Sequence, residues 1–296
     1  MKISRTLSVI AALLLPVLAI GASSGGTMAR AAAPGPTVPY RDSYPITVVA
    51  GDYDLVYRVL DFAPGAGIPL HYHGGPTAMV EVDGELTLRS HDGSERKLKP
   101  ADTANEQAGA HHVMVNTSTA GARILVMMLL PRGAQVTTVV DTATKMPGPT
   151  VTFKGSYPIT PVAGEYDLVN NVLEFAPGAE VPLHYHGGPA VIVGMDGELT
   201  LRAGGHEHTL KPGDLDTQPA GAQHVMQNMG AGSARALFGV LLPKGAKLTT
   251  LVEPPAVGMP STGISNMSNW LVPALAFSLL CLVLGGIYKS RRPAKR

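Results

Sequence analysis

The strongest constraint on the fold of this 296-residue chain is that its middle part is written twice. Residues 44–89 align with residues 157–202 without a gap, and only 12 of the 46 aligned pairs differ. The match continues to the Leu-Pro pairs at residues 130–131 and 242–243. A period of about 113 residues is far longer than that of solenoid repeats, which is roughly 20–50 residues. The sequence therefore predicts two whole domains that arose by duplication.

Both copies have the residue pattern of β-strands. In the first copy the strand-like run Met-Val-Glu-Val at residues 79–82 is followed by Asp83-Gly84, and the second copy repeats this pair as Asp196-Gly197. Asp-Gly between two strand-like runs is a strong hairpin signal, so we expect a hairpin at each pair. Neither copy contains a long apolar pattern with the 3.6-residue period of a helix. The sequence predicts an all-β chain with two tandem antiparallel barrels or jelly rolls.

Composition excludes several classes of protein. The 23 Lys and Arg residues nearly balance the 22 Asp and Glu residues, which leaves a formal charge of +1. Such a chain has no basic excess to hold nucleic acid, so we expect no nucleic-acid partner. Hydrophobic residues make up 45% of the chain, which is incompatible with intrinsic disorder. The single cysteine, Cys281, excludes an intramolecular disulfide framework.

Residues 1–31 have the pattern of a secretory signal peptide. Lys2 and Arg5 precede an apolar stretch at residues 7–20, and Ala-Arg-Ala at residues 29–31 forms a small-residue cleavage site. A retained membrane anchor is the alternative, but the apolar stretch is shorter than the roughly 20 residues that a spanning helix needs. The sequence predicts export of the mature chain.

The other end has the pattern of a membrane anchor. Residues 270–288 are apolar and uncharged, and a basic tail follows at residues 289–296. About 18 apolar residues suffice to cross a bilayer core, and a basic tail favours the cytoplasmic side. Trp270 and Tyr288 bracket the segment, as interfacial aromatic residues do. We therefore predict a transmembrane helix at residues 270–288, a short cytoplasmic tail, and a Pro-, Ser- and Gly-containing stalk at residues 254–269.

A pentapeptide in this stalk has two interpretations. Residues 259–263 read Met-Pro-Ser-Thr-Gly. Together with the apolar segment and the basic tail, they resemble the L-P-x-T-G sorting signal of Gram-positive surface proteins. That resemblance implies a sortase partner, which would cleave after Thr262 and join the chain to the cell wall. Met259 replaces the usual Leu, so an ordinary stalk before a membrane anchor is an equal alternative.

Six of the ten histidines recur at matching positions, namely His71, His73 and His112 in the first copy and His184, His186 and His224 in the second. Residues i and i+2 of a strand share one face, so each H-x-H pair points to one side. Two imidazoles at this spacing and a third from a later strand can converge on one divalent metal ion. A lone H-x-H pair could equally be a polar strand face, but the duplicated triad favours metal binding.

The same segments resemble the cupin superfamily. Its first motif, G-x5-H-x-H-x3/4-E-x6-G, is matched around both H-x-H pairs by Gly65 and Gly84 and by Gly178 and Gly197. Its second motif, G-x5-P-x-G-x2-H-x3-N, is matched in full in the second copy by Gly213, Pro219, Gly221, His224 and Asn228. The first copy has Ala101 and Gln107 where that motif has Gly and Pro. The chain thus resembles a bicupin, which implies a cupin-type β-barrel at residues 44–141, a linker at 142–156 and a second barrel at 157–253, each with a metal inside.

The resemblance fails at one metal ligand. The glutamate of the first motif falls at Thr77 and Ala190, which cannot replace a carboxylate. Glu81 is near in sequence, but its counterpart is Gly194, so it is not a shared ligand. Three neutral imidazoles leave the charge of the ion uncompensated, which favours an anionic or chelating ligand. Such a site suits zinc, copper, nickel or ferrous iron, and it suits manganese less because manganese prefers oxygen ligands.

Three further expectations concern residues near the triads. Met114 and Met226 lie two residues beyond the third histidines and should line the barrel interiors. Asn116 and Asn228 should bond the backbone rather than a metal. The His-Glu-His sequence at residues 206–208 has no counterpart in the first copy and should form a solvated turn.

Two functions remain open from the sequence. The first is a metal-dependent, dioxygenase-like oxidoreductase that acts on a small oxygenated or anionic substrate, although no catalytic residue is identified. The second is a non-catalytic surface module that binds a metal, a sugar or a small acid. A degenerate scaffold is a third reading, against which the intact triads argue. A small-molecule ligand is expected in both leading cases, and assembly into a homo-oligomer stays open.

Overall fold

The computed structural model describes residues 33–253. The predicted signal peptide, the Met-Pro-Ser-Thr-Gly pentapeptide and the predicted transmembrane helix lie outside these residues. Every helix or strand in the described range is a β-strand, so the predicted all-β fold is confirmed there. Between residues 33 and 253, no helix is long and apolar enough to cross a membrane.

The first barrel consists of two five-stranded sheets. The inner sheet, which faces the second barrel, has the order β11 (Thr150–Ile159), β2 (Tyr53–Phe62), β9 (Ala122–Pro131), β4 (Thr77–Asp83) and β7 (Thr103–Glu106). The outer sheet has the order β10 (Thr138–Val139), β3 (Gly67–Tyr72), β8 (His112–Val115), β5 (Leu86–Ser90) and β6 (Glu95–Leu98).

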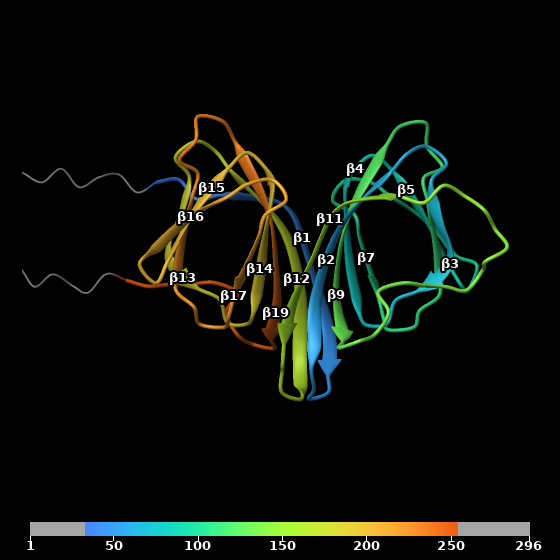
Figure 1. Cartoon of the computed structure of the whole chain (residues 1–296), viewed down its shortest axis with the longest axis horizontal. Helices are drawn as coiled ribbons and strands as arrows, with labels where there is room; N and C mark the ends of the chain where they lie inside the picture. Colours follow the sequence, from blue (N-terminus) through green and yellow to red (C-terminus); the bar gives the residue numbers. More distant parts are fainter. Residues whose placement is uncertain (1–32, 254–296) are drawn as a thin grey trace, which may run out of the picture.

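The second barrel repeats this arrangement, and the two barrels lie side by side (Figure 1). Its inner sheet has the order β1 (Thr37–Val48), β12 (Gly164–Phe175), β19 (Ala234–Pro243), β14 (Ala190–Asp196) and β17 (Leu215–Gln218). Its outer sheet has the order β16 (His206–Leu210), β15 (Leu199–Ala203), β18 (His224–Gln227), β13 (Glu180–Tyr185) and β20 (Thr250–Leu251).

The two repeats exchange their first strands. β1 belongs to the first repeat, but it pairs antiparallel with β12 of the second, with Tyr44 opposite Leu168. In the same way β11 of the second repeat pairs with β2 of the first, with Tyr157 opposite Leu55. Residues 150–156, which the sequence analysis places in a linker, form the first part of β11. One barrel in space is therefore not one repeat in sequence.

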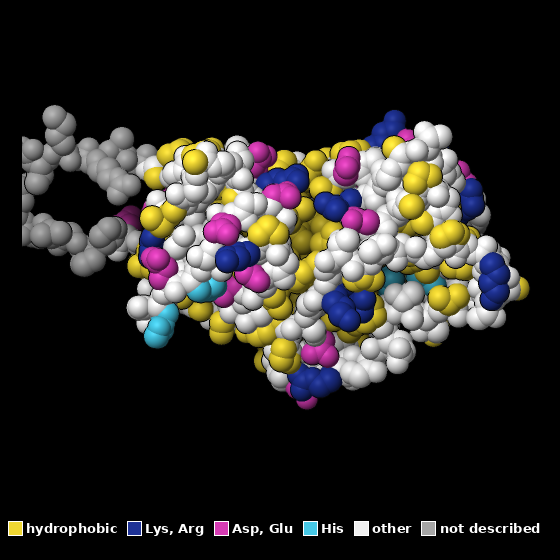
Figure 2. Space-filling view, turned by 45° about the horizontal axis from the view of Figure 1, so that its top comes forward, with side chains coloured by type: hydrophobic (Ala, Val, Ile, Leu, Met, Phe, Trp, Pro, Cys, Tyr) yellow, Lys and Arg dark blue, Asp and Glu magenta, His cyan; other side chains and the backbone are white. Residues whose placement is uncertain are grey.

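Three hydrophobic cores follow from this arrangement. One fills each barrel, and the third lies between the barrels, where the two inner sheets stack. Hydrophobic side chains are visible in the hollow between the two halves of the molecule (Figure 2). The central strands of the inner sheets are therefore buried on both faces, which explains the unbroken apolar run of β9 from Ile124 to Leu130. The edge strands β1 and β11 keep an alternating pattern of exposed and less exposed residues.

The two predicted Asp-Gly hairpins are wrong. β4 pairs with β9 and β7 in the inner sheet, whereas β5 pairs with β6 and β8 in the outer sheet. Gly84 therefore carries the chain from one sheet to the other, with a φ of 80°. A Cβ at Gly84 would lie 2.2 Å from the carbonyl oxygen of Gly121, so only glycine fits. Gly197 makes the same sheet-to-sheet corner between β14 and β15.

The glycine missing from the second cupin motif of the first copy leaves a strained residue. Ala101 has a φ of 76°, and its counterpart Gly213 has a φ of 89°. An L-residue in this region costs roughly 1–2 kcal/mol, which glycine avoids. We expect Ala101→Gly to raise the free energy of unfolding by about 1 kcal/mol, measured by urea denaturation. Gly213→Ala should lower it by a similar amount, and a stabilising Gly213→Ala would contradict this account.

In the core between the barrels, the Tyr57 side chain packs against the backbone of Gly239. Tyr57 is fully buried, and its hydroxyl lies near Met127 and Asn170. The backbone of Gly239 passes so close that a Cβ there would lie 1.6 Å from the Tyr57 hydroxyl.

Gly239→Ala should therefore overpack this core and lower the free energy of unfolding by about 1–3 kcal/mol. Gly232→Ala is the matched control, because a Cβ at Gly232 meets no atom within 4 Å. Urea denaturation of both variants tests the close approach, and equal stabilities would refute it.

Candidate metal centre

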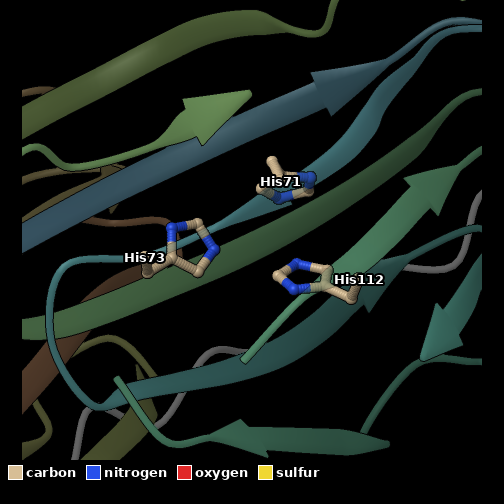
Figure 3. A group of neighbouring side chains, drawn as sticks. All are labelled: His71, His73 and His112. Carbon is tan, nitrogen blue, oxygen red and sulfur yellow. The ribbon is translucent and has the colours of Figure 1, made fainter. Parts of the chain in front are cut away.

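The first histidine triad lies inside the first barrel. His71 is on β3, His73 follows the end of that strand, and His112 begins β8, directly opposite His71. The ring centroids of His71 and His112 are 4.0 Å apart, and His73 lies 5.2 and 5.3 Å from them. Figure 3 shows the three imidazoles grouped around one small space. All three are buried, so the strands bring together the residues that the H-x-H spacing singled out.

The second triad repeats this geometry in the second barrel. His184 on β13 lies opposite His224 on β18, and His186 follows β13. Their ring centroids are 4.1, 4.9 and 5.1 Å apart. In each triad one ring nitrogen per histidine lies within 4.8 Å of the other two, which is close enough for one ion to bind all three. The predicted convergence of three histidines in each copy is therefore observed.

Backbone carbonyls orient the imidazoles. Every Nδ1 atom lies 2.7–3.4 Å from a carbonyl oxygen; the partners are Pro69, Val136 and Ala110 in the first barrel and Pro182, Leu248 and Ala222 in the second. An Nδ1–H that donates to a carbonyl leaves the Nε2 lone pair free, which is the arrangement of metal-binding histidines. The Nε2 atom of His224 is buried with no hydrogen-bond partner. These donors fit a divalent metal ion.

Burial disfavours the protonated form of five of these imidazoles. Desolvation, supported by the neighbouring imidazoles, lowers the pKa of His71 and of His186 to about 3 and that of His184 to about 4. Burial also lowers the pKa of His73 and of His224. A metal ion would therefore not have to displace protons from these histidines at neutral pH.

No carboxylate joins either triad among residues 33–253. The hydroxyl of Thr77 donates to the carbonyl of Gly75, and Ala190 has no donor to offer. Glu81 is fully buried outside the triad, and burial raises the pKa of its carboxyl to about 9. The two donor sets therefore consist of imidazoles alone, as the departure from the cupin motif predicted.

One carboxylate contacts the first triad from behind, and the sequence analysis missed it. Glu106 Oε2 lies 3.0 Å from Nδ1 of His112. Its counterpart in the second repeat is Gln218, whose amide donates to Asp216 instead. The difference between Glu and Gln at matching positions was the available signal. It gave no indication that this side chain lies against a histidine from the next strand.

Each triad borders a cavity, and the two cavities differ in size. The first has a volume of about 30 Å³ and is lined in part by Arg58 on β2. The second has a volume of about 260 Å³ and is lined by Asn171, the counterpart of Arg58, and by Arg41 of the exchanged strand β1. Neither arginine was predicted from the sequence, and Arg41 reaches this site only through the strand exchange.

Other expectations near the triads have mixed outcomes. Met114 and Met226 line the two cavities, as predicted. The amides of Asn116 and Asn228 donate to backbone carbonyls of Phe62 and Phe175, also as predicted. The predicted turn at residues 206–208 is wrong, since these residues begin strand β16; they are exposed, and His208 lies 3.3 Å from Asp216.

Comparison with known proteins agrees with this architecture. The cupin domain family matches residues 58–128 and 171–240, one match in each repeat. Oxalate decarboxylase from Lactobacillus farciminis, solved as a formate complex, superposes with a TM-score of 0.50 at 14% identity, covering 74% of this chain and 90% of that one. AerE from Microcystis aeruginosa superposes with a TM-score of 0.47 at 17% identity, covering 69% and 98%. No curated protein matches the chain. At these identities the structural likeness concerns the fold alone.

The lowered histidine pKa values make the stability of the metal-free protein depend on pH. Below an ordinary pKa of 6.5 the unfolded chain binds protons that the folded triads reject, so stability is full above pH 6.5 and falls toward pH 3–4. When the pH falls from 7 to 5, each of His71, His184 and His186 should lower the free energy of unfolding by about 2 kcal/mol. Glu81 acts in the opposite sense, because its pKa is raised in the folded state. The same pH change should let it raise the free energy of unfolding by roughly 2.5 kcal/mol.

We therefore expect a net loss in the free energy of unfolding of at least about 3 kcal/mol between pH 7 and pH 5, since His73 and His224 act in the same direction as the other histidines. Urea denaturation with a chelator present measures this loss. Glu81→Gln should deepen the loss, because it removes the opposing contribution. Equal stability at the two pH values would contradict the assignment.

Proposed function

The chain belongs to the cupin superfamily as a bicupin, and from this premise we propose that each barrel binds one divalent metal ion through its three histidines. The observation that carries the proposal is the orientation of the six imidazoles. Their Nδ1 atoms all lie near backbone carbonyls, while one nitrogen of each ring lies close to its two partners in a buried cluster. Burying three imidazoles face to face without a ligand would leave polar nitrogens unsatisfied, as at His224.

The donor set bears on which ion is bound. Zinc, copper, nickel and ferrous iron accept imidazole ligands readily, whereas manganese favours oxygen donors. With three protein ligands, the bound ion would supply Lewis acidity and open coordination positions for a ligand. The histidines would hold the ion, and the backbone carbonyls beside their Nδ1 atoms would fix their tautomer.

Two functions are compatible with such sites, and they differ in whether the cavity must contain a catalytic side chain. A dioxygenase-like oxidoreductase acting on a small oxygenated or anionic substrate is the leading chemistry. The residues that line the two cavities include no carboxylate, so neither cavity offers a carboxyl general base. This observation favours the alternative, a non-catalytic module that binds a metal, a sugar or a small acid. Oxygen uptake by the metal-loaded protein with flavonols and small carboxylic acids discriminates between them.

We place the protein at the cell surface on the basis of the sequence at its two ends. The signal-peptide pattern at residues 1–31 supports export, and the apolar segment at residues 270–288 supports a membrane anchor. Cleavage after Thr262 by a sortase would instead link the chain to the cell wall. Thr262→Ala should then retain the protein in the membrane fraction, whereas unchanged fractionation would support the plain anchor.

Metal stoichiometry tests the proposal directly. The detergent-solubilised chain should contain two equivalents of metal by elemental analysis. His71→Ala with His73→Ala should leave one equivalent, His184→Ala with His186→Ala should also leave one, and the quadruple variant should leave none. Calorimetric titration with zinc, copper, nickel and ferrous ions identifies the preferred metal. Retention of wild-type affinity by the quadruple variant would refute the site, and circular dichroism checks that the variants are folded.

A further inference from the structure

The two metal sites have the same three ligands but differ in the space beside them. The second cavity has a volume of about 260 Å³, and the first has a volume of about 30 Å³. The strands around them align residue by residue, so the difference comes from substitutions between the repeats. The clearest is Arg58 in the first barrel against Asn171 in the second. The Arg58 side chain occupies the first cavity wall, where its Nε atom is buried without a hydrogen-bond partner.

The exchanged strand supplies a cation to the larger cavity. Arg41 on β1 lies opposite Asn171 on β12, and both residues line this cavity. A bulge between Thr37 and Tyr40 shifts the alternation of the strand, so that Val38 and Arg41 both reach the cavity. The residues between them in sequence do not line it. Arg41 is therefore directed at the second site by the strand exchange and by the bulge together.

Arg41 is exposed and, within residues 33–253, takes part in none of the salt bridges. The segments before and after this range contain neither Asp nor Glu. The matching position in the other exchanged strand is also basic, because Lys154 on β11 lies opposite Arg58. Lys154 is exposed and does not line the first cavity, so only the second cavity has a cation from an exchanged strand in its wall.

The larger cavity has the chemistry of a site for a small organic anion. Its walls are mainly apolar, with Val181, Ile192 and Phe238 among them, and the histidine triad lies on one side. Asn171 is buried among these residues, opposite Arg41. A volume of about 260 Å³ is just below the roughly 300–1,000 Å³ of pockets for drug-sized ligands. The first cavity, at about 30 Å³, has room for about one water molecule.

We propose that the second barrel alone is the ligand site of this protein. It takes a small monocarboxylate with an apolar body, whose negative charge is balanced by Arg41 and by the metal ion. The first barrel, which Arg58 closes, holds its metal ion without an organic ligand. This inference rests on the proposed binding of a metal ion by each triad, and it adds the ligand class and the division of roles between the barrels.

The test uses benzoate as the probe and benzamide, its neutral analogue of the same shape, as the control ligand. The full chain is loaded with cobalt, so that ligand binding changes its visible absorption spectrum, and calorimetry counts the ligand. We expect one equivalent of benzoate per chain and at least tenfold weaker binding of benzamide. Two equivalents of benzoate, none, or equal affinities for the two probes would overturn the inference.

Matched variants locate the site. Arg41→Gln should weaken benzoate binding roughly 10-fold, because a hydrogen-bonded charge partner is lost. Lys154→Gln removes one positive charge at the matching position of the other barrel and should leave the affinity unchanged. Asn171→Arg should close the second cavity and abolish binding, whereas Arg58→Asn should open the first and add a second equivalent. Equal effects of Arg41→Gln and Lys154→Gln would refute the assignment to the second barrel.

Metal content measured on the same samples separates this inference from the proposed metal binding. Two equivalents of metal without benzoate binding would overturn the ligand site and leave the metal sites standing. If the chain takes up no metal on loading but still binds benzoate in an Arg41-dependent way, the proposed metal binding is refuted and the anion site stands. Urea denaturation of each variant shows whether a loss of binding reflects the site or a loss of folding.

Discussion

Main-chain pairing between β1 and β12, and between β11 and β2, is the interaction on which the rest of this structure depends. Each inner sheet is completed by a strand from the other repeat, so neither repeat contains a whole barrel. The stacked inner sheets then form a core shared by both repeats, with Tyr57 packed against the backbone of Gly239. Separating the barrels would break two strand pairings and expose that core. The relative position of the two sites is therefore fixed by the fold itself.

Within this frame the two triads are nearly identical, whereas their surroundings differ. In both barrels a backbone carbonyl lies beside each Nδ1 atom, with Glu106 also beside that of His112, which makes each triad a preformed set of donors. The differences lie at residues next to the triads: the first barrel has Arg58 where the second has Asn171, and Glu106 where the second has Gln218. The two repeats thus share the three histidines of each triad and differ at the neighbouring positions. Substitutions at such neighbouring positions can change what a site accepts without changing what holds the metal.

Some of the fold and much of the site could be predicted from particular residues. The H-x-H pairs and the later histidines identified both triads, and Thr77 and Ala190 correctly indicated that the usual carboxylate is missing. The Asp83-Gly84 pair was misread as a hairpin, because a turn signal specifies a local backbone conformation and not the sheet in which the next strand lies. Ala101 was noted as a departure from a motif, but the strain of its positive φ appears only in the folded backbone. Arg41 was missed because it reaches its site from a strand distant in sequence, whereas Glu106 was missed because nothing in the spacing shows that its side chain lies against His112.

The sequence by itself determined the duplication, the β-strand character of both copies and the two sets of three histidines, since these follow from repeats and spacing along the chain. Only the tertiary structure decided which first strand completes which barrel. The segments at residues 44–47 and 157–160 have the same sequence, Tyr-Pro-Ile-Thr, so local preference is the same for both. The partner of each strand is set by non-local pairing and by burial between the two inner sheets. That choice brings Arg41 to the second cavity, and it is a property of the folded chain.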